Sequence, residues 1–270
     1  RLPCRAMEIA KTKQIQGRRL RLGRALDARI VFLHVTKCGG NSLRLALRDV
    51  YRSPFSGGGR RRLHVSPGTS RRAAESLGIP TEAFRDALLR YHLRDDAKCR
   101  LFTGHFFWPE KLLDEFPDVS FVTLLRDPVA HFLSNYYEAR EDGRSGESLE
   151  AFLDSEAAER IGTRFARNFA GSVFEPDKFE PAQIELAQSR LAQVAVLGVL
   201  EDLPGFIDDF ERRFGARLRL PHANAGALRQ RAAREELSDA LRARIAERVA
   251  ANQALYDFAR SEIARRRAAR

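Results

Sequence analysis

The segment from Arg29 to Leu43, with the sequence RIVFLHVTKCGGNSL, most strongly constrains what this chain can fold into. Its part from Ile30 to Val35 is a nearly continuous apolar run, rich in β-branched and aromatic residues. Such a run is typical of a strand that is buried on both faces in a parallel sheet. Gly39 and Gly40 then form a short loop, since glycine adopts backbone conformations closed to other residues. The spacing of the leucines that follow predicts a helix up to about residue 51.

The rest of the chain alternates predicted strands with predicted helices. Further apolar runs predict strands at Arg100–Thr103, Val119–Leu125 and Val194–Leu200. Helical patterns cover Thr81–Leu93, Pro128–Arg140, Leu149–Glu159, Pro181–Gln193, Leu203–Phe214 and Glu235–Arg267. This alternation predicts an α/β fold of three layers, in which helices flank a central, mostly parallel sheet.

Several residues predict where the helices begin and end. Asp127 can cap a helix whose first position is Pro128, where proline is tolerated. Gly215 is expected to end the helix that precedes it. Thr81 is the expected cap of its own helix, and Asn41 or Ser42 that of the helix after the glycine loop.

Length and composition predict one domain over residues 1–270. Residues 1–28 form a basic lead-in, and residues 235–270 form a C-terminal helical region. Residues 53–80 are expected to be a loop or insertion, because Ser53–Ser70 holds proline, serine and three consecutive glycines.

The glycine loop has the composition of an anion site. Its backbone amides, the start of the next helix and the Lys37 ammonium can surround one anion. A Walker A loop places lysine and serine or threonine side by side after the last glycine. Here Lys37 precedes both glycines, and Ser42 lies five residues beyond it. The alternative, in which no anion binds, is an ordinary strand-to-helix turn with a solvated lysine.

Arg126 and Ser134 form a second candidate element. Arg126 leaves the predicted strand Val119–Leu125 and can present a planar fork to a phosphate. Ser134 lies two turns into the next helix and can donate its hydroxyl to the same anion. The alternative is that Arg126 pairs with a carboxylate and that Ser134 packs inside the protein. Since parallel strands end at one edge of a sheet, the loops after Val35, Thr103 and Leu125 can form one site.

These two elements resemble, in order, the cofactor-binding elements of sulfotransferases. The loop Thr36–Ser42 is similar to the family's Pro-Lys-Thr-Gly-Gly-Thr-Ser loop. It differs at three positions, where Thr36 replaces Pro, and Cys38 and Asn41 each replace Thr. The carbohydrate branch related to heparan sulfate 2-O-sulfotransferases is the most similar. The resemblance implies a P-loop-like fold, carbohydrate sulfation and use of 3′-phosphoadenosine-5′-phosphosulfate (PAPS), with no metal. It also implies that the 5′-phosphosulfate is held by Lys37, Cys38, Gly39, Gly40, Asn41 and Ser42.

The resemblance extends to two further sets of residues. The segment Val122–Tyr137 resembles the family's Arg-Asp-Pro…Ser element, which implies that Arg126 and Ser134 hold the 3′-phosphate. The thiol of Cys38 is a poorer donor than the hydroxyl usual there. Thr163–Asn168, Leu197–Glu201 and Leu255–Phe258 resemble later parts of the family, and a structural role is favoured for all three.

His105 is the candidate general base. A near-neutral imidazole suits removal of a hydroxyl proton, and Thr103–Phe106 is similar to the Gly-His segment of carbohydrate sulfotransferases. The implied roles are proton removal by His105 and stabilisation by Lys37 of charge on the leaving phosphate. His34 is disfavoured because it lies in the predicted strand, and His64, His92 and His131 have no comparable context.

The chain carries a formal charge of +11, which predicts anionic partners. We expect a hydroxylated acceptor, with an anionic glycan as one possibility, and no specific nucleic acid. The arginine clusters, among them Arg60–Arg62 and Arg265–Arg267, are individually expected to be solvated surface. Two other functions stay open. An ATP-dependent small-molecule kinase predicts magnesium dependence, whereas a non-catalytic polyanion-binding protein predicts steep salt dependence and no PAPS binding.

Cys4, Cys38 and Cys99 form no paired framework, which favours a reducing compartment and predicts a cytoplasmic protein. No apolar run reaches the roughly 20 residues of a membrane span. The chain starts at Arg1 rather than Met, so an upstream segment stays open.

Overall fold

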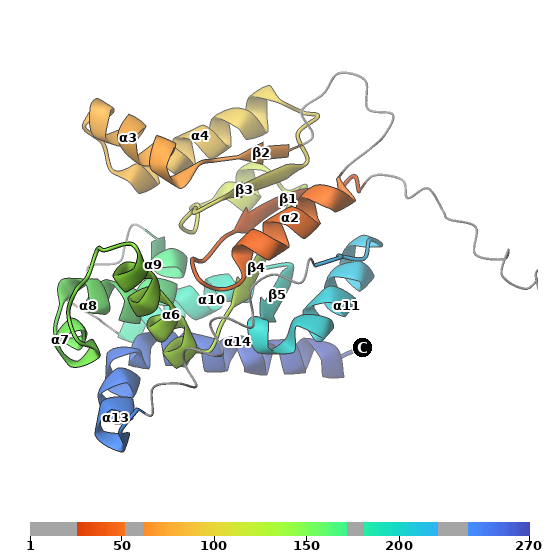
Figure 1. Cartoon of the computed structure of the whole chain (residues 1–270). Coiled ribbons are helices and arrows are strands. Elements are labelled where there is room, and N and C mark those ends of the chain that lie inside the picture. The colour runs from red at the N-terminus through yellow and green to blue at the C-terminus, as the bar shows by residue number, and fades with distance from the viewer. Residues whose placement is uncertain (1–25, 52–61, 172–180, 221–236) are drawn as a thin grey trace, which may run out of the picture.

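The computed structural model describes residues 26–51, 62–171, 181–220 and 237–270 (Figure 1). Its centre is a five-stranded sheet in the order β2-β3-β1-β4-β5, and every neighbouring pair is parallel. The strands are β1 Arg29–Leu33, β2 Arg62–His64, β3 Leu101–Gly104, β4 Val119–Leu125 and β5 Val196–Val199. The predicted α/β fold with a mostly parallel central sheet is therefore confirmed.

Alternate residues of the strands face two separate apolar layers. Ile30 and Phe32 pack with α2 (Gly40–Val50) and α11 (Leu203–Phe214) on one face of the sheet. Val31 and Leu33 face the other layer. That layer is formed by α4 (Thr81–Asp95), α9 (Arg164–Ala170), α10 (Pro181–Leu191) and α14 (Ala250–Ala268). Because helices cover both faces, every residue of β1 after Arg29 is buried, which explains its continuous apolar sequence.

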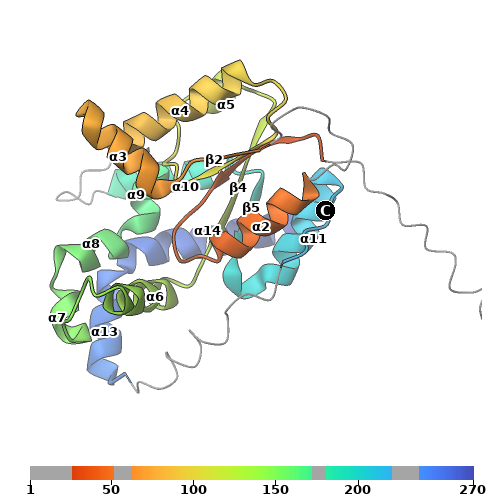
Figure 2. The same cartoon turned by 45° about the horizontal axis from the view of Figure 1, so that its top comes forward.

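A third apolar cluster lies beyond one end of the sheet. It is built by α6 (Pro128–Glu141), α7 (Leu149–Leu153), α8 (Glu156–Gly162) and α13 (Asp239–Arg248). Figures 1 and 2 both show these helices at the end toward which β1 runs into its loop. The elements that remain are α3 (Pro67–Leu77), α5 (Leu112–Glu115) and the 3₁₀ helix η2 (Leu200–Asp202).

Several predicted boundaries are confirmed by local hydrogen bonds. β4 has the predicted bounds, and Asp127 Oδ1 accepts from the Ala130 amide at 2.8 Å to cap α6. Gly215 ends α11 with a φ of 70°, in the left-handed region that glycine tolerates. Thr81, by contrast, is the first residue of α4 rather than its cap, which is Pro80.

The expectation of a loop over residues 53–80 is wrong for residues 62–64 and 67–77. Residues 52–61 lie outside the described residues, but β2 and α3 occupy 62–64 and 67–77. β2 is a three-residue edge strand whose outer residues are exposed, so it leaves no apolar run to detect. The predicted helix 149–159 is two helices, because Ser148 and Ser155 each cap a new start.

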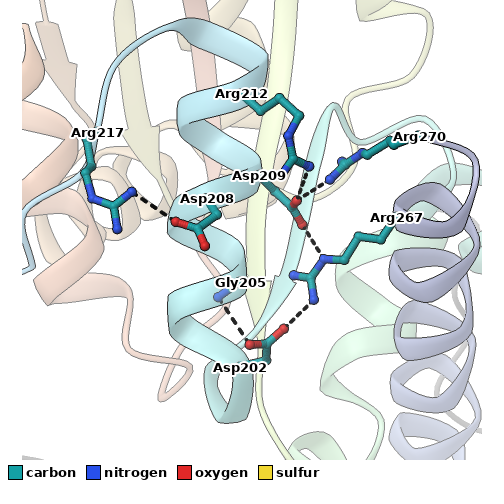
Figure 3. Close-up of polar contacts among 8 residues, drawn as sticks. All are labelled: Asp202, Gly205, Asp208, Asp209, Arg212, Arg217, Arg267 and Arg270. Carbon is teal, nitrogen blue, oxygen red and sulfur yellow. Dashed lines mark hydrogen bonds and ion pairs between the residues drawn. The ribbon is translucent and has the colours of Figure 1, made fainter.

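The C-terminal helical region is confirmed, with a break at Val249 between α13 and α14. Of its arginine cluster, Arg265 is exposed as expected, but Arg266 and Arg267 are partly buried and paired. Arg267 bonds Asp202 at 2.6 Å and Asp209 at 2.9 Å, and Arg270 also bonds Asp209 (Figure 3). These ion pairs fasten the end of α14 to α11. The basic lead-in 1–25, with Cys4, and the cluster residues Arg60 and Arg61 lie outside the described residues.

Within the described ranges, no helix combines the length and apolar character needed to cross a bilayer.

Asn252 joins three helices through a buried side-chain amide. Its Oδ1 accepts from the Phe165 amide and its Nδ2 donates to the Ile161 carbonyl, both at 2.8 Å, and the residue is fully buried. We predict that Asn252→Ala lowers the free energy of unfolding by about 3 kcal/mol, because two buried backbone groups lose their partners. Urea denaturation measures this. The neighbouring Gln253→Ala should cost less than about 0.5 kcal/mol, since its side chain makes an exposed contact with Asp257.

Candidate functional site

Three polar loops meet where β3, β1 and β4 end. β1 lies between β3 and β4, so the loops that follow these strands are neighbours at one edge of the sheet. Two hydrogen bonds join them directly: Arg126 Nη1 donates to the Lys37 carbonyl at 3.2 Å, and His105 Nδ1 bonds the His34 carbonyl at 2.9 Å. The structure thus brings together the three loops that the sequence singled out.

The loop after β1 turns its backbone amides toward this edge. Lys37 has a φ of 60° and Gly39 a φ of 76°, both in the left-handed region. Backbones of this kind form concave nests of amide groups that bind anions. Gly39 caps α2 without a side-chain bond, so the expectation that Asn41 or Ser42 is the cap is wrong. The first bond within α2 runs from the Leu43 amide to the Gly39 carbonyl, which leaves the amides of its first turn available.

Both glycines of the loop are also required by packing inside the protein. A Cβ on Gly40 would lie 1.9 Å from the His34 ring, and one on Gly39 would lie 2.9 Å from Leu200 Cδ1. His34 can therefore pack flat against the start of α2 only because residue 40 has no side chain. At Gly40, the space that a side chain would fill is therefore occupied by this histidine.

Cys38 turns its side chain away from the loop surface. It is 1% exposed and belongs to the apolar layer that contains Val35 and Leu125. Burial raises the pKa of its thiol, which therefore stays protonated. Residue 38 can still offer its backbone amide to an anion. The replacement of the family's hydroxyl by the Cys38 thiol therefore affects packing and does not remove a side-chain donor from the site.

Lys37 has a partner that the sequence did not indicate. Its Nζ lies 2.8 Å from Oε1 of Glu138 on α6. The side chain is about one-fifth exposed, at 21%, so the ammonium lies at the rim of the loop rather than in bulk solvent. The alternative of a strand-to-helix turn with a solvated lysine therefore does not describe this loop.

Arg126 and Ser134 both keep hydrogen-bonding capacity. The carboxylate partner considered for Arg126 does not occur among the described residues, and Arg126 donates to the Lys37 carbonyl instead. Ser134 is 2% exposed, and its Oγ has no partner in the described part of the chain. A buried hydroxyl without a partner costs about 1–3 kcal/mol, which a bound acceptor would offset.

Thr36 Oγ1 and Arg164 Nε are further buried donors without partners among the described ranges. His131 on α6 lies close to the Thr36 backbone and to the charges of Arg164 and Arg126. Burial, together with the charges of Arg164 and Arg126, lowers the pKa of His131 to about 3. His131 had no recognised context in the sequence. The helical spacing of residues 131, 134 and 138 on α6 could have revealed it, since such positions share one face.

His105 is held in one tautomer. The His34 carbonyl can accept but not donate, so His105 Nδ1 carries the proton and Nε2 keeps its lone pair. Burial lowers the pKa of His105 to about 4, and the charges of Arg85 and Arg164 contribute. The ring is therefore neutral near pH 7, as a base must be. Arg85 Nη1 fixes the segment by donating to the His105 carbonyl at 3.1 Å.

His34 lies beside His105, and its predicted position inside the strand is wrong. β1 ends at Leu33, so His34 lies just beyond the strand. Its ring stacks on that of His105 with the centroids 4.4 Å apart. His34 thus holds His105 through both its carbonyl and its ring.

Glu201, which lies in η2 directly after β5, holds the backbone beside the site through two hydrogen bonds. Its Oε1 accepts from the Asp127 amide at 3.0 Å and its Oε2 from the Tyr256 hydroxyl at 2.9 Å. These bonds fix the backbone next to Arg126 to α14. A structural role, expected for the segments that hold Glu201 and Tyr256, agrees with these contacts.

Comparison with known proteins gives little to add to this geometry. No protein-family model matches the sequence, and no curated protein matches it. Among solved structures, the chain is similar to one titled as a sulfotransferase from Alicyclobacillus acidocaldarius, with 17% sequence identity and a TM-score of 0.42. That match covers 82% of this chain and 95% of the other. A TM-score this low does not support an inference about function from the similarity.

Proposed function

We propose that this chain is a sulfotransferase that moves the sulfuryl group of PAPS to a hydroxyl of a carbohydrate or hydroxylated metabolite. The observation that supports the proposal is that Lys37, Arg126 and a neutral His105 lie in loops joined by hydrogen bonds at one edge of the sheet, and that Ser134 lies on the helix that follows Arg126. Ser134 Oγ is buried there without a partner in the described ranges, although most buried polar groups are paired.

The residues fit a nucleotide that has anions at two ends. The amides of residues 38–42 and the Lys37 ammonium form one donor set, which suits a 5′-phosphosulfate. Arg126 and Ser134 form the second set, which suits a 3′-phosphate. Two separate donor sets favour PAPS over a ligand with one phosphate group.

The chemistry assigned to the chain is in-line transfer. His105 Nε2 takes the proton of the acceptor hydroxyl as the oxygen–sulfur bond forms. The bond from sulfur to the bridging phosphate oxygen breaks, and Lys37 neutralises the charge that develops on that oxygen. As in phosphoryl transfer, the protein contributes mostly positioning and preorganised charge.

Removing either cationic side chain should impair the donor site. We predict that Arg126→Ala weakens binding of adenosine 3′,5′-bisphosphate about 10- to 100-fold, because a hydrogen bond to a charged group is worth about 1.5–3 kcal/mol. Lys37→Ala should lower turnover about 100- to 1,000-fold. Titration calorimetry and transfer from labelled PAPS measure the two effects.

Arg71→Ala is the matched control, since Arg71 is an exposed residue of α3 that pairs with Glu75. If Lys37→Ala and Arg126→Ala both bind and turn over like the natural chain, the site assignment is wrong. Binding of ATP with magnesium, without a requirement for the 3′-phosphate, would favour a kinase instead.

His105 should act in chemistry rather than in donor binding. We predict that His105→Ala lowers turnover about 100- to 10,000-fold with little change in the affinity for adenosine 3′,5′-bisphosphate. The neutral ring is the active form and its pKa is lowered from 6.5 to about 4. The value of kcat/KM should therefore stay level from about pH 7.5 to about pH 5.5 and fall only as the pH approaches 4.

A pH–rate profile tests this directly. An acid limb near pH 6.5, or full turnover in His105→Ala, would remove His105 as the base. His92→Ala, in the last turn of α4, should leave both turnover and profile unchanged.

The acceptor is proposed to carry a carboxylate or sulfate beside the reacting hydroxyl. Arg164 is mostly buried, has no ion-pair partner in the described ranges, and lies close enough to His105 and His131 to lower the pKa of each. A buried guanidinium of this kind favours an anionic ligand.

Matched disaccharides test the acceptor class. We predict that one with a uronic acid carboxylate is sulfated at least about tenfold faster than the same sugar with that carboxylate reduced to an alcohol. Mass spectrometry of the products measures both rates. Arg164→Ala should abolish the preference, whereas Arg160→Ala, at an exposed position on α8, should retain it. Equal rates in the natural chain would contradict the proposal.

A further inference from the structure

We propose that Glu138 is a positioning residue that holds the Lys37 ammonium and competes with the sulfuryl donor for it. The inference rests on the proposed function, because it concerns the lysine that would bind the phosphosulfate. It starts from the ion pair in the structure, in which Lys37 Nζ lies 2.8 Å from Glu138 Oε1.

Glu138 lies on the same face of α6 as the other residues of the donor site. Positions 131, 134 and 138 are spaced as one helical stripe, so His131, Ser134 and Glu138 all turn toward the loop after β1. His131 and Ser134 are buried there. The carboxylate is therefore the one negative group on a stripe whose other two members offer neutral side chains.

The backbone of Lys37 is fixed while its side chain can change partners. Its φ of 60° sets the turn, and Arg126 Nη1 holds its carbonyl. Rotation about the side-chain bonds of a lysine can carry its ammonium from a carboxylate to a neighbouring anion without moving the loop. The exchange therefore needs no rearrangement of the fold.

A second cation stays near Glu138 when Lys37 leaves it. Arg144 Nη2, which pairs with Asp142 at 2.8 Å, also lies 3.7 Å from Glu138 Oε2. The Arg144 amide donates to the Ala139 carbonyl at 2.8 Å, which keeps this arginine beside α6. The Glu138 side chain is 43% exposed, so water can also solvate the carboxylate. The carboxylate would not be left as an unpaired buried charge, which makes the exchange of partners feasible.

An ionised carboxylate at this position weakens donor binding in two ways. It pairs with the ammonium that the phosphosulfate requires, and it repels the phosphosulfate itself. The first effect depends on Lys37 and the second does not, so the two can be separated by experiment.

The test is a double-mutant cycle on donor-product affinity. Adenosine 3′,5′-bisphosphate is titrated calorimetrically into the full chain, Glu138→Gln, Lys37→Met, and the combination of both. Gln keeps the size of Glu and removes its charge. We expect Glu138→Gln to tighten binding about 5- to 10-fold in the natural background, and less than about twofold when Lys37 is Met. Glu150→Gln, an exposed change of the same charge in the first turn of α7, is the control and should have no effect.

Each outcome decides between the two proposals. If the natural chain does not bind the nucleotide, the proposed function fails and the role of Glu138 fails with it. If it binds but Glu138→Gln binds equally or more weakly, the role of Glu138 alone is overturned. Equal tightening with and without Lys37 also overturns it, because the effect would then be repulsion and not competition for the lysine. Non-additive tightening is the result that supports it.

Discussion

The parallel pairing of β1 with both β3 and β4 is the constraint on which the site depends. Leu33 is in register with Gly104, so β1 and β3 end at the same level. The His34 amide continues the ladder by donating to the Gly104 carbonyl at 3.2 Å. Phe32 is in register with Val122, and β4 continues to Leu125, beyond the end of β1. Short loops then bring Arg126 to the Lys37 carbonyl and His105 to the His34 carbonyl. A slip of one residue between β1 and β3 would turn alternate side chains to the opposite face and separate His34 from His105.

Helix α6 connects this edge to the third apolar cluster. Phe132, Leu133 and Tyr136 pack with α7, α8 and α13, whereas Ser134 and Glu138 turn toward the loop after β1. The helix is thus held firmly by apolar contacts that are separate from its polar stripe. Asp127 and Glu201 fix its beginning through bonds to backbone amides, and Glu201 is itself held by Tyr256. The donors of the site therefore belong to elements that are anchored independently of any ligand.

Sequence patterns were sufficient for the features that depend on local chemistry. Long apolar runs predicted β1 and β4, and the Asp-Pro and Gly signals predicted the start of α6 and the end of α11. Features that depend on contacts between distant segments could not be predicted. Glu138 lies 101 residues from Lys37, and the clash that requires Gly40 involves a ring that follows β1. The inward turn of Cys38 depends on the left-handed backbone around it, and β2 is too short to form a pattern.

Carboxylates are distributed unevenly between two groups of arginines in the described part of the chain. At the end of α14, Asp202 and Asp209 neutralise arginines of α11 and α14, and Asp209 alone contacts Arg212, Arg267 and Arg270 (Figure 3). At the edge where β1 and β4 end, Arg126 and Arg164 have no carboxylate partner among the described residues, and Glu138 pairs with Lys37. The chain has 36 acidic residues, so the lack of carboxylate partners at this edge does not come from a shortage of acidic residues. Unpaired guanidinium groups at the partly buried end of a sheet create a local positive potential, which a bound anion can neutralise. Among the described residues, these two guanidinium groups therefore add positive potential beside the loop after β1.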